Sequence, residues 1–174
     1  MDICVFCTGI HDPESEKKLS SEKIRKIMET NFFGTVNSIM AVNKYFRERK
    51  NGHISIVSSV AGYRGLPAAA GYCASKAALT SLAESLFFDF KRYNVRISLV
   101  SPGFIKTPLT DKNKFSMPMI KSPEYAAEKM FIGLTKKNVF ELHFPKTFTI
   151  LVKLLKIMPN WLFLWLIERG VKRF

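Results

Sequence analysis

Four short apolar segments alternate with longer segments that carry helix signals, and this alternation constrains the fold most strongly. The apolar segments are residues 3–6, 54–57, 95–100 and 139–144. Their lengths are those of strands, and the first is apolar throughout, as expected for a strand that a parallel sheet buries on both faces. Strands that alternate with helices predict an α/β fold, in which helices cover both faces of a parallel sheet.

Capping and helix-breaking residues divide the segments between these strands. Ser20 or Ser21 can cap a helix that starts near residue 21, and Asn51-Gly52 ends it near residue 50. Glycine and proline mark the loops, because both interrupt regular structure. The other predicted elements are helices over residues 71–93 and 123–134, and loops at residues 62–67 and 102–103.

Composition bounds the class of protein. A chain of 174 residues suits one domain, and its 47% of apolar residues is enough for a sizeable core. The formal net charge is +13, but the lysines and arginines are spread along the chain. A nucleic-acid-binding protein more often concentrates such charge on one face or one helix, so we expect no nucleic-acid partner.

The three cysteines predict no metal site. Cys4 and Cys7 have Cys-x-x-Cys spacing, but no second pair follows, and on a strand their side chains point to opposite faces. Reduced cysteines that pack as small apolar residues fit a cytoplasmic protein. The N-terminal segment does not have the basic and long apolar regions of a secretory signal, which agrees with that expectation.

Tyr72 and Lys76 form a candidate catalytic pair. They are four residues apart near the start of a predicted helix, so they share one face of it. A tyrosine hydroxyl normally has a pKa near ~10, and a neighbouring ammonium lowers this pKa because it favours the phenolate. Such a tyrosine can exchange a proton with a carbonyl or alcohol oxygen near neutral pH. A surface tyrosine beside a surface lysine is the alternative.

Two further polar residues stand where a functional side chain is expected. Ser59 follows the predicted strand 54–57, and ligands of parallel sheets bind beyond the carboxyl ends of the strands. Its hydroxyl is therefore a candidate to hold a substrate oxygen beside Tyr72. Asn31 continues an apolar stripe of its helix, and a buried polar side chain needs hydrogen-bonding partners. A turn serine and a satisfied core asparagine are the alternatives.

Three motifs occur in order along the chain. The first is Thr30-Asn31-Phe-Phe-Gly34. The second consists of Ser59-Val-Ala-Gly and Tyr72-Cys-Ala-Ser-Lys76, in which the serine stands 13 positions before the tyrosine. The third is Ser101-Pro102-Gly103-Phe-Ile-Lys-Thr107. In this order and spacing they resemble the asparagine segment, the active-site segment and the cofactor-contacting turn of short-chain dehydrogenases/reductases. The resemblance covers residues 2–145 and implies the C-terminal part of a Rossmann-like domain, a parallel sheet with flanking helices.

The resemblance implies a role for each matched residue. Tyr72 would be the general acid/base of hydride transfer between NAD or NADP and a small carbonyl or alcohol substrate. Lys76 would lower the pKa of Tyr72 and hold the nicotinamide ribose. Ser59 would orient the substrate carbonyl, and Asn31 would hold a proton-relay water near Lys76. The cofactor-contacting positions would be Gly9, Tyr72, Lys76, Pro102, Gly103 and Thr107.

The chain departs from the family at its N-terminal side. It contains no G-x-x-x-G-x-G phosphate loop, the segment that binds the cofactor pyrophosphate at a helix N-terminus. Phe6-Cys7-Thr8-Gly9 matches the family's Asn-Asn-Ala-Gly turn only at Gly9. We therefore expect an N-terminally truncated fold, either a piece of a longer enzyme or a natural truncation. It would have an open sheet edge and bind NAD(P) poorly by itself.

Residues 146–174 form an apolar and basic tail. Two lysines and Pro159-Asn160 interrupt its apolar residues, so we predict two short helices rather than one membrane-spanning helix. Basic residues together with Trp161 and Trp165 are typical of a peripheral membrane anchor. Helices that close the substrate pocket or pack in a subunit interface are the alternative.

Two classes of function remain open at this point. The leading hypothesis is an NAD(P)-dependent oxidoreductase, and its rival is a truncated, non-catalytic protein of the same fold with an interaction or membrane-surface role. Small residues such as Ala74 and Ala78 follow Gly71 on the predicted helix and permit close helix packing. The resemblance implies that this helix takes part in a homo-oligomer.

Overall fold

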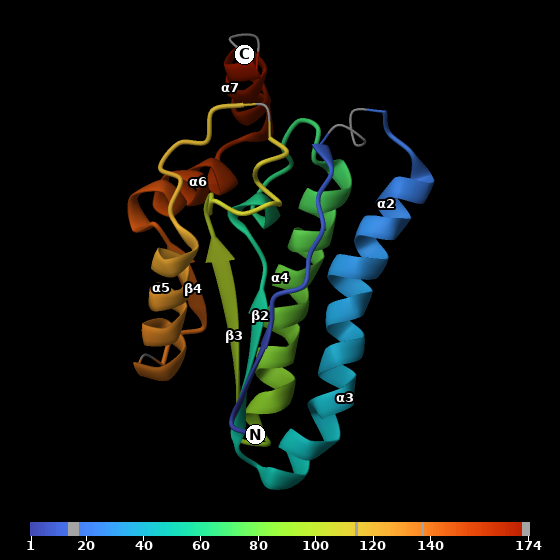
Figure 1. Cartoon of the computed structure of the whole chain (residues 1–174), viewed down its shortest axis with the longest axis vertical. Helices are drawn as coiled ribbons and strands as arrows, with labels where there is room; N and C mark the ends of the chain where they lie inside the picture. The colour runs from blue at the N-terminus through green and yellow to red at the C-terminus, as the bar shows by residue number, and fades with distance from the viewer. Residues whose placement is uncertain (14–17, 114, 137, 172–174) are drawn as a thin grey trace.

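Four parallel strands form one sheet in the order β1-β2-β3-β4 in the computed structural model, which describes residues 1–13, 18–113, 115–136 and 138–171 (Figure 1). The strands are β1 Ile3–Phe6, β2 Gly52–Val57, β3 Val95–Pro102 and β4 Glu141–Phe144. Every neighbouring pair is parallel, so the carboxyl ends of all four strands meet at one end of the sheet. The predicted parallel α/β architecture is confirmed.

Helices cover the two faces of the sheet. The main helices are α2 Ser21–Met28, α3 Gly34–Arg49, α4 Ala70–Lys91 and α5 Pro123–Lys136. Figure 1 shows α2, α3 and α4 on one side of the sheet and α5 on the other. Phe46 and Leu79 pack on Ile54 in the larger core, whereas Leu134 packs on Val100 in the smaller one. The alternation of side chains along β2 and β3 supplies both cores, since successive residues point to opposite faces.

The long helix predicted over residues 21–50 contains an irregular turn. Between α2 and α3 the backbone forms a π-helical segment, η1, over Glu29–Phe33. A π-helical turn inserts one extra residue into a helix and occurs often at functional sites. A short 3-10 helix, η2 Val60–Gly62, follows β2 at the carboxyl end of the sheet.

Strand β1 lies at an edge of the sheet. Within the described residues it pairs with β2 alone. Cys4 and Phe6 pack against the larger core, while Ile3 and Val5 are exposed on the opposite face. The predicted open edge is therefore present in the part of the chain that the structure describes.

The tail forms two short helices, α6 Lys146–Ile157 and α7 Asn160–Val171, as predicted; residues 172–174 lie outside the described part. Pro159 lies between them, where the last turn of α6 has ended. Among the described residues, no helix combines the length and apolar character that a membrane span requires.

Gly52 provides a test of how β2 packs on α3. Its φ is +151°, and a methyl group on its Cα would lie 2.1 Å from Cδ1 of the buried Phe46 ring. We expect Gly52→Ala to lower the free energy of unfolding in urea by about 2–3 kcal/mol, through backbone strain and overpacking. Gly65→Ala is the matched control, because no atom lies within 4 Å of the added methyl group. Equal effects of the two substitutions would contradict this packing.

Candidate active site

The Lys76 side chain is buried at the carboxyl end of the sheet. It projects from α4 with only 4% of its surface exposed, and its Nζ donates a hydrogen bond to the Val57 carbonyl oxygen at 3.0 Å. Burial lowers the pKa of this amine from 10.5 to about 8, and the nearby Cys7 partly opposes that effect. A group with this pKa remains mostly protonated at pH 7. The site therefore holds a positive charge in a largely dehydrated position.

The backbone at Gly9 passes close to that charge. A methyl group at Gly9 would lie 3.4 Å from Nζ of Lys76 and 3.7 Å from Oδ1 of Asn31. The segment after β1 thus passes close to both side chains. The structure brings these three predicted site residues together, although they are far apart in the sequence.

Asn31 is fully buried in η1 and fastens the segment after β1. Its Oδ1 accepts a hydrogen bond from the Ile10 backbone N–H at 2.7 Å, and its Nδ2 donates to the Ile10 carbonyl at 3.0 Å. Nδ2 also donates to Oγ of Ser75 at 3.0 Å. The predicted need of a buried asparagine for partners is met by backbone and side-chain groups. This pairing holds Gly9 beside Lys76.

Tyr72 lies in the first turn of α4, on the same helix as Lys76. The Lys76 Nζ is 5.8 Å from the centroid of the Tyr72 ring. The His11 ring lies against it with centroids 4.5 Å apart. Tyr72 also packs on the small buried cluster that contains Ala61 and Cys73. The tyrosine is therefore positioned by α4, by η2 and by the segment after β1.

Ser59 lies at the N-terminus of η2, next to α4. Its Oγ accepts a hydrogen bond from the Ala61 backbone N–H at 3.1 Å. The adjacent Ser58 fixes η2 to α4, because its hydroxyl donates to the Lys76 carbonyl at 2.8 Å. A methyl group at Gly62 would lie only 2.8 Å from the same carbonyl oxygen, so η2 and α4 pack backbone against backbone. This packing places Ser59 on the Tyr72 side of the sheet.

The predicted cofactor-contacting turn follows β3 at the same end of the sheet. Pro102 ends the strand, and the Gly103 N–H donates to the Phe144 carbonyl at 2.8 Å. A methyl group at Gly103 would lie 2.8 Å from Cδ1 of Phe148 in α6. The Thr107 N–H donates to Oγ1 of Thr110 at 2.9 Å. Gly103 thus contacts the tail, and Thr107 contacts its own turn.

Sequence reasoning missed three supporting residues. His11 contacts Tyr72 from a loop that carries no periodic pattern, and Ser75 supports Asn31 from between the two residues of the catalytic pair. Ser58 was overlooked beside Ser59, although both follow β2 directly. Their roles depend on contacts between distant segments, which spacing along the chain does not reveal.

Other features of the surface lie apart from these residues. A hollow of about 290 Å³ is lined by Ile39 and Phe90, between α3 and α4, and a second of about 610 Å³ lies near His53 at the amino end of the strands. Ligands of parallel sheets bind beyond the carboxyl ends of the strands, and neither hollow lies there. We therefore place the candidate active site at Lys76 and Tyr72 rather than in either hollow. In the described ranges, no three His, Cys, Asp or Glu side chains gather as a metal site requires.

The arrangement supplies the components of a proton transfer. A phenol hydroxyl and a buried ammonium project from one helix face, close to the backbone at Gly9. An ammonium in a site of low polarity stabilises a nearby negative charge more than it does in water. The chemistry that these groups fit is general acid/base catalysis at a carbonyl or alcohol oxygen.

Known proteins with similar sequences are oxidoreductases. The family model described as short chain dehydrogenase matches residues 1–117. An uncharacterized oxidoreductase of Myxococcus xanthus is 37% identical over 163 residues, which cover 94% of this chain and 64% of that protein. A 3-ketodihydrosphingosine reductase of Bacteroides thetaiotaomicron is 32% identical over 126 residues, which cover 72% of this chain and 47% of that protein.

A solved structure shares the fold. The crystal structure of a short chain dehydrogenase from Burkholderia cenocepacia, in complex with NADP, matches with a TM-score of 0.73 at 24% identity. The match covers 87% of this chain and 64% of that one. This chain thus spans about half to two thirds of the length of the relatives that it matches.

The Asn31 pairing can be tested through stability. Asn31→Ala would leave the N–H and C=O groups of Ile10, which are partly buried, without their partners. We expect the free energy of unfolding to fall by about 3 kcal/mol, because buried polar groups that lose their partners are costly. The matched control is Asn37→Ala, at an exposed position of α3, with an expected change within about 0.5 kcal/mol. A neutral Asn31→Ala substitution would contradict the pairing.

Proposed function

The chain belongs to the short-chain dehydrogenase family, and on that premise we propose that it transfers hydride between NAD or NADP and a carbonyl or alcohol carbon. The observation that carries the proposal is the buried Lys76 ammonium beside Tyr72 and Gly9. Charge buried in this way is costly for a purely structural lysine, but useful where charge develops during a reaction.

Tyr72 acts as the general acid/base in this proposal. In the reducing direction its hydroxyl gives a proton to the carbonyl oxygen as the carbon receives hydride, and in the oxidising direction the phenolate takes the alcohol proton. Lys76 stabilises the phenolate through its positive charge. Ser59 orients the substrate oxygen from η2, and Asn31 keeps a water near Lys76 for proton exchange with solvent.

The residues around Lys76 fit the nicotinamide end of a cofactor. A side chain at Gly9 would contact Nζ of Lys76, at 3.4 Å from its first carbon, so glycine at this position keeps the ammonium accessible to a ribose hydroxyl. Pro102, Gly103 and Thr107 complete the contacts from the turn after β3. When bound, the cofactor supplies or accepts the hydride. The chain contains no glycine-rich phosphate loop, so we propose that these residues form the nicotinamide half of the cofactor site.

A ketone is the substrate group that we infer for the reducing direction. The Bacteroides relative is named as a reductase of 3-ketodihydrosphingosine. We further propose a cytoplasmic protein that assembles as a homo-oligomer through α4 and contacts a membrane surface through residues 146–174. A non-catalytic interaction protein is the alternative that the activity test must exclude.

Tyr72→Phe tests the proposal directly. It keeps the ring and its packing but removes the hydroxyl, so we expect kcat for ketone-dependent oxidation of NADH or NADPH to fall by about 10²–10⁴-fold. Tyr45→Phe is the matched control, because this exposed tyrosine lies on α3 and takes no part in the proposed site; its activity should equal that of the wild type.

Two outcomes would count against this function. Unchanged turnover in Tyr72→Phe would remove Tyr72 from the chemistry. A folded wild-type chain that binds NAD or NADP in a fluorescence titration but turns over no ketone or alcohol would favour the non-catalytic alternative.

A further inference from the structure

Helix α6 turns its apolar side outward. Ile150, Leu151, Leu154 and Ile157 are between 50% and 79% exposed. Their spacing places them on one face of the helix, while Thr149 on another face is fully buried. Helices of water-soluble domains normally show the reverse arrangement, with the apolar stripe against the core. The orientation of α6 therefore requires an explanation.

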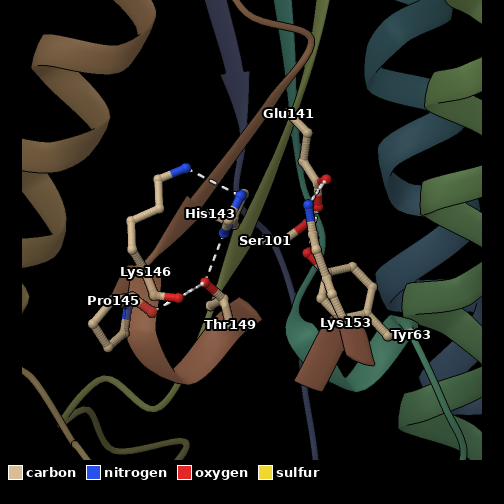
Figure 2. A network of polar contacts seen from close by, with 8 residues as sticks. All are labelled: Tyr63, Ser101, Glu141, His143, Pro145, Lys146, Thr149 and Lys153. Atoms are coloured by element: carbon tan, nitrogen blue, oxygen red, sulfur yellow. Dashed lines mark hydrogen bonds and ion pairs between the residues drawn. The ribbon is translucent and has the colours of Figure 1, made fainter. Parts of the chain in front are cut away.

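Polar contacts from the inner side of α6 fix this orientation (Figure 2). The Lys153 ammonium lies 2.5 Å from Oε2 of Glu141 in β4. Oε1 of the same carboxylate accepts hydrogen bonds from the hydroxyls of Ser101, at 2.8 Å, and Tyr63. Burial raises the pKa of Glu141, but these three donors outweigh it and hold the pKa below its usual value. An ionised carboxylate with this many donors anchors α6 to the sheet.

A second set of contacts supports the start of the helix. Nδ1 of His143 lies 2.6 Å from Oγ1 of Thr149, and Nζ of Lys146 lies 3.0 Å from Nε2 of His143. Figure 2 shows that both sets join β4 to α6. The polar side of α6 is thus satisfied within the protein, which leaves its apolar side for a partner outside it.

Helix α7 follows the same pattern. Trp161, Leu164 and Trp165 lie on one face and are between 44% and 72% exposed. Phe163, on the other side, is buried, and Cζ of Arg64 lies 4.3 Å from the centroid of its ring. Arg64 also donates hydrogen bonds to the side chain of Asn160 and to the carbonyl of Met158. The inner side of α7 is therefore also occupied.

Residues 115–120 extend the apolar surface towards the candidate active site. Phe115, Met119 and Ile120 are exposed, and the segment joins α6 through Phe104, whose ring contacts Phe115 at 5.9 Å and Phe148 at 5.5 Å. Figure 1 shows α6, α7 and the loop after β3 together at the carboxyl end of the sheet. The apolar surface and Tyr72 therefore lie at the same end of the molecule.

We propose that this apolar platform docks on an anionic lipid surface. The platform consists of Phe115, Met119, Ile120, Ile150, Leu151, Leu154, Ile157, Trp161, Leu164 and Trp165. Lys146 and Lys153 are engaged by the inner contacts, whereas Lys156 and Arg169 on the two helices and Lys106 in the loop after β3 are exposed. The whole chain carries +13. Exposed tryptophans with basic residues beside an apolar face match the chemistry of a membrane–water interface.

The charge favours lipid over a second copy of the chain. Two platforms packed face to face would bring their basic residues together, whereas anionic headgroups neutralise them. The lipid would be a partner that binds next to the candidate active site, so this proposal rests on the proposed function for the role of that site. Binding to lipid does not itself depend on hydride transfer, so the two proposals can fail separately.

Vesicle binding by the full chain tests the proposal. Vesicles of phosphatidylcholine and phosphatidylserine in a ratio of about 7:3 should sediment the wild type, and neutral phosphatidylcholine vesicles should sediment less of it. Both tryptophans of the chain lie in α7, so their fluorescence reports on the platform alone. We expect a blue shift with anionic vesicles and quenching by brominated acyl chains.

Two double variants with equal charge separate the platform from the rest of the surface. Leu151→Glu/Leu154→Glu should weaken vesicle binding about tenfold or more, because it places carboxylates against the bilayer. Met40→Glu/Phe131→Glu alters residues on α3 and α5 that are 62% and 64% exposed, and should bind like the wild type. Tyr72→Phe should also bind like the wild type, even if it is inactive.

Three results would overturn the proposal. One is a wild type that stays in the supernatant with anionic vesicles and shows no fluorescence shift. Another is equal binding by the two folded double variants. A third is a wild type that forms an oligomer but does not bind vesicles, together with a monomeric Leu151→Glu/Leu154→Glu variant. That result would identify a second copy of the chain as the partner.

Discussion

The buried ammonium of Lys76 is the constraint around which the carboxyl end of the sheet is built. Its pKa of about 8, against 10.5, means that the folded state resists protonation more than the unfolded chain does. Below pH 8 the folded protein bears the full cost of about 3 kcal/mol, and this cost disappears as the pH rises from 8 towards 10.5. The cores on both faces of the sheet offset that cost.

The surrounding backbone fits closely around this side chain. Val57 provides a carbonyl acceptor, Gly9 approaches without a side chain, and Gly62 lets η2 pack on the helix that carries the lysine. Asn31 holds the segment after β1 in place through Ile10. The buried position of Lys76 thus depends on residues from three separate parts of the chain.

The fold was largely predictable because strands and helices follow local apolar patterns and breakers such as Asn51-Gly52. The proximity of Tyr72 and Lys76 followed from their spacing on one helix, whereas their proposed roles came from the resemblance of the surrounding motifs. The π-helical turn at Asn31 was not predictable, because Glu29–Phe33 contains no glycine or proline and the apolar pattern continues through it. His11 was missed because it lies in a loop, which has no periodic pattern. The sequence shows the apolar stripe of α6 but not that this stripe faces outward. The orientation of α6 depends on the Lys153–Glu141 contact, which joins two separate elements.

The same contacts link the tail to the candidate active site, since Tyr63 directly follows η2 and binds the carboxylate that anchors α6. The central claim nevertheless concerns Lys76, and its own titration is the most direct test. With ¹³C-labelled lysine, the NMR signal that disappears in Lys76→Met identifies this residue in the folded wild type. The account predicts a midpoint near pH 8. A midpoint near 10.5, the ordinary value, would show that the amine is solvated and would contradict the account.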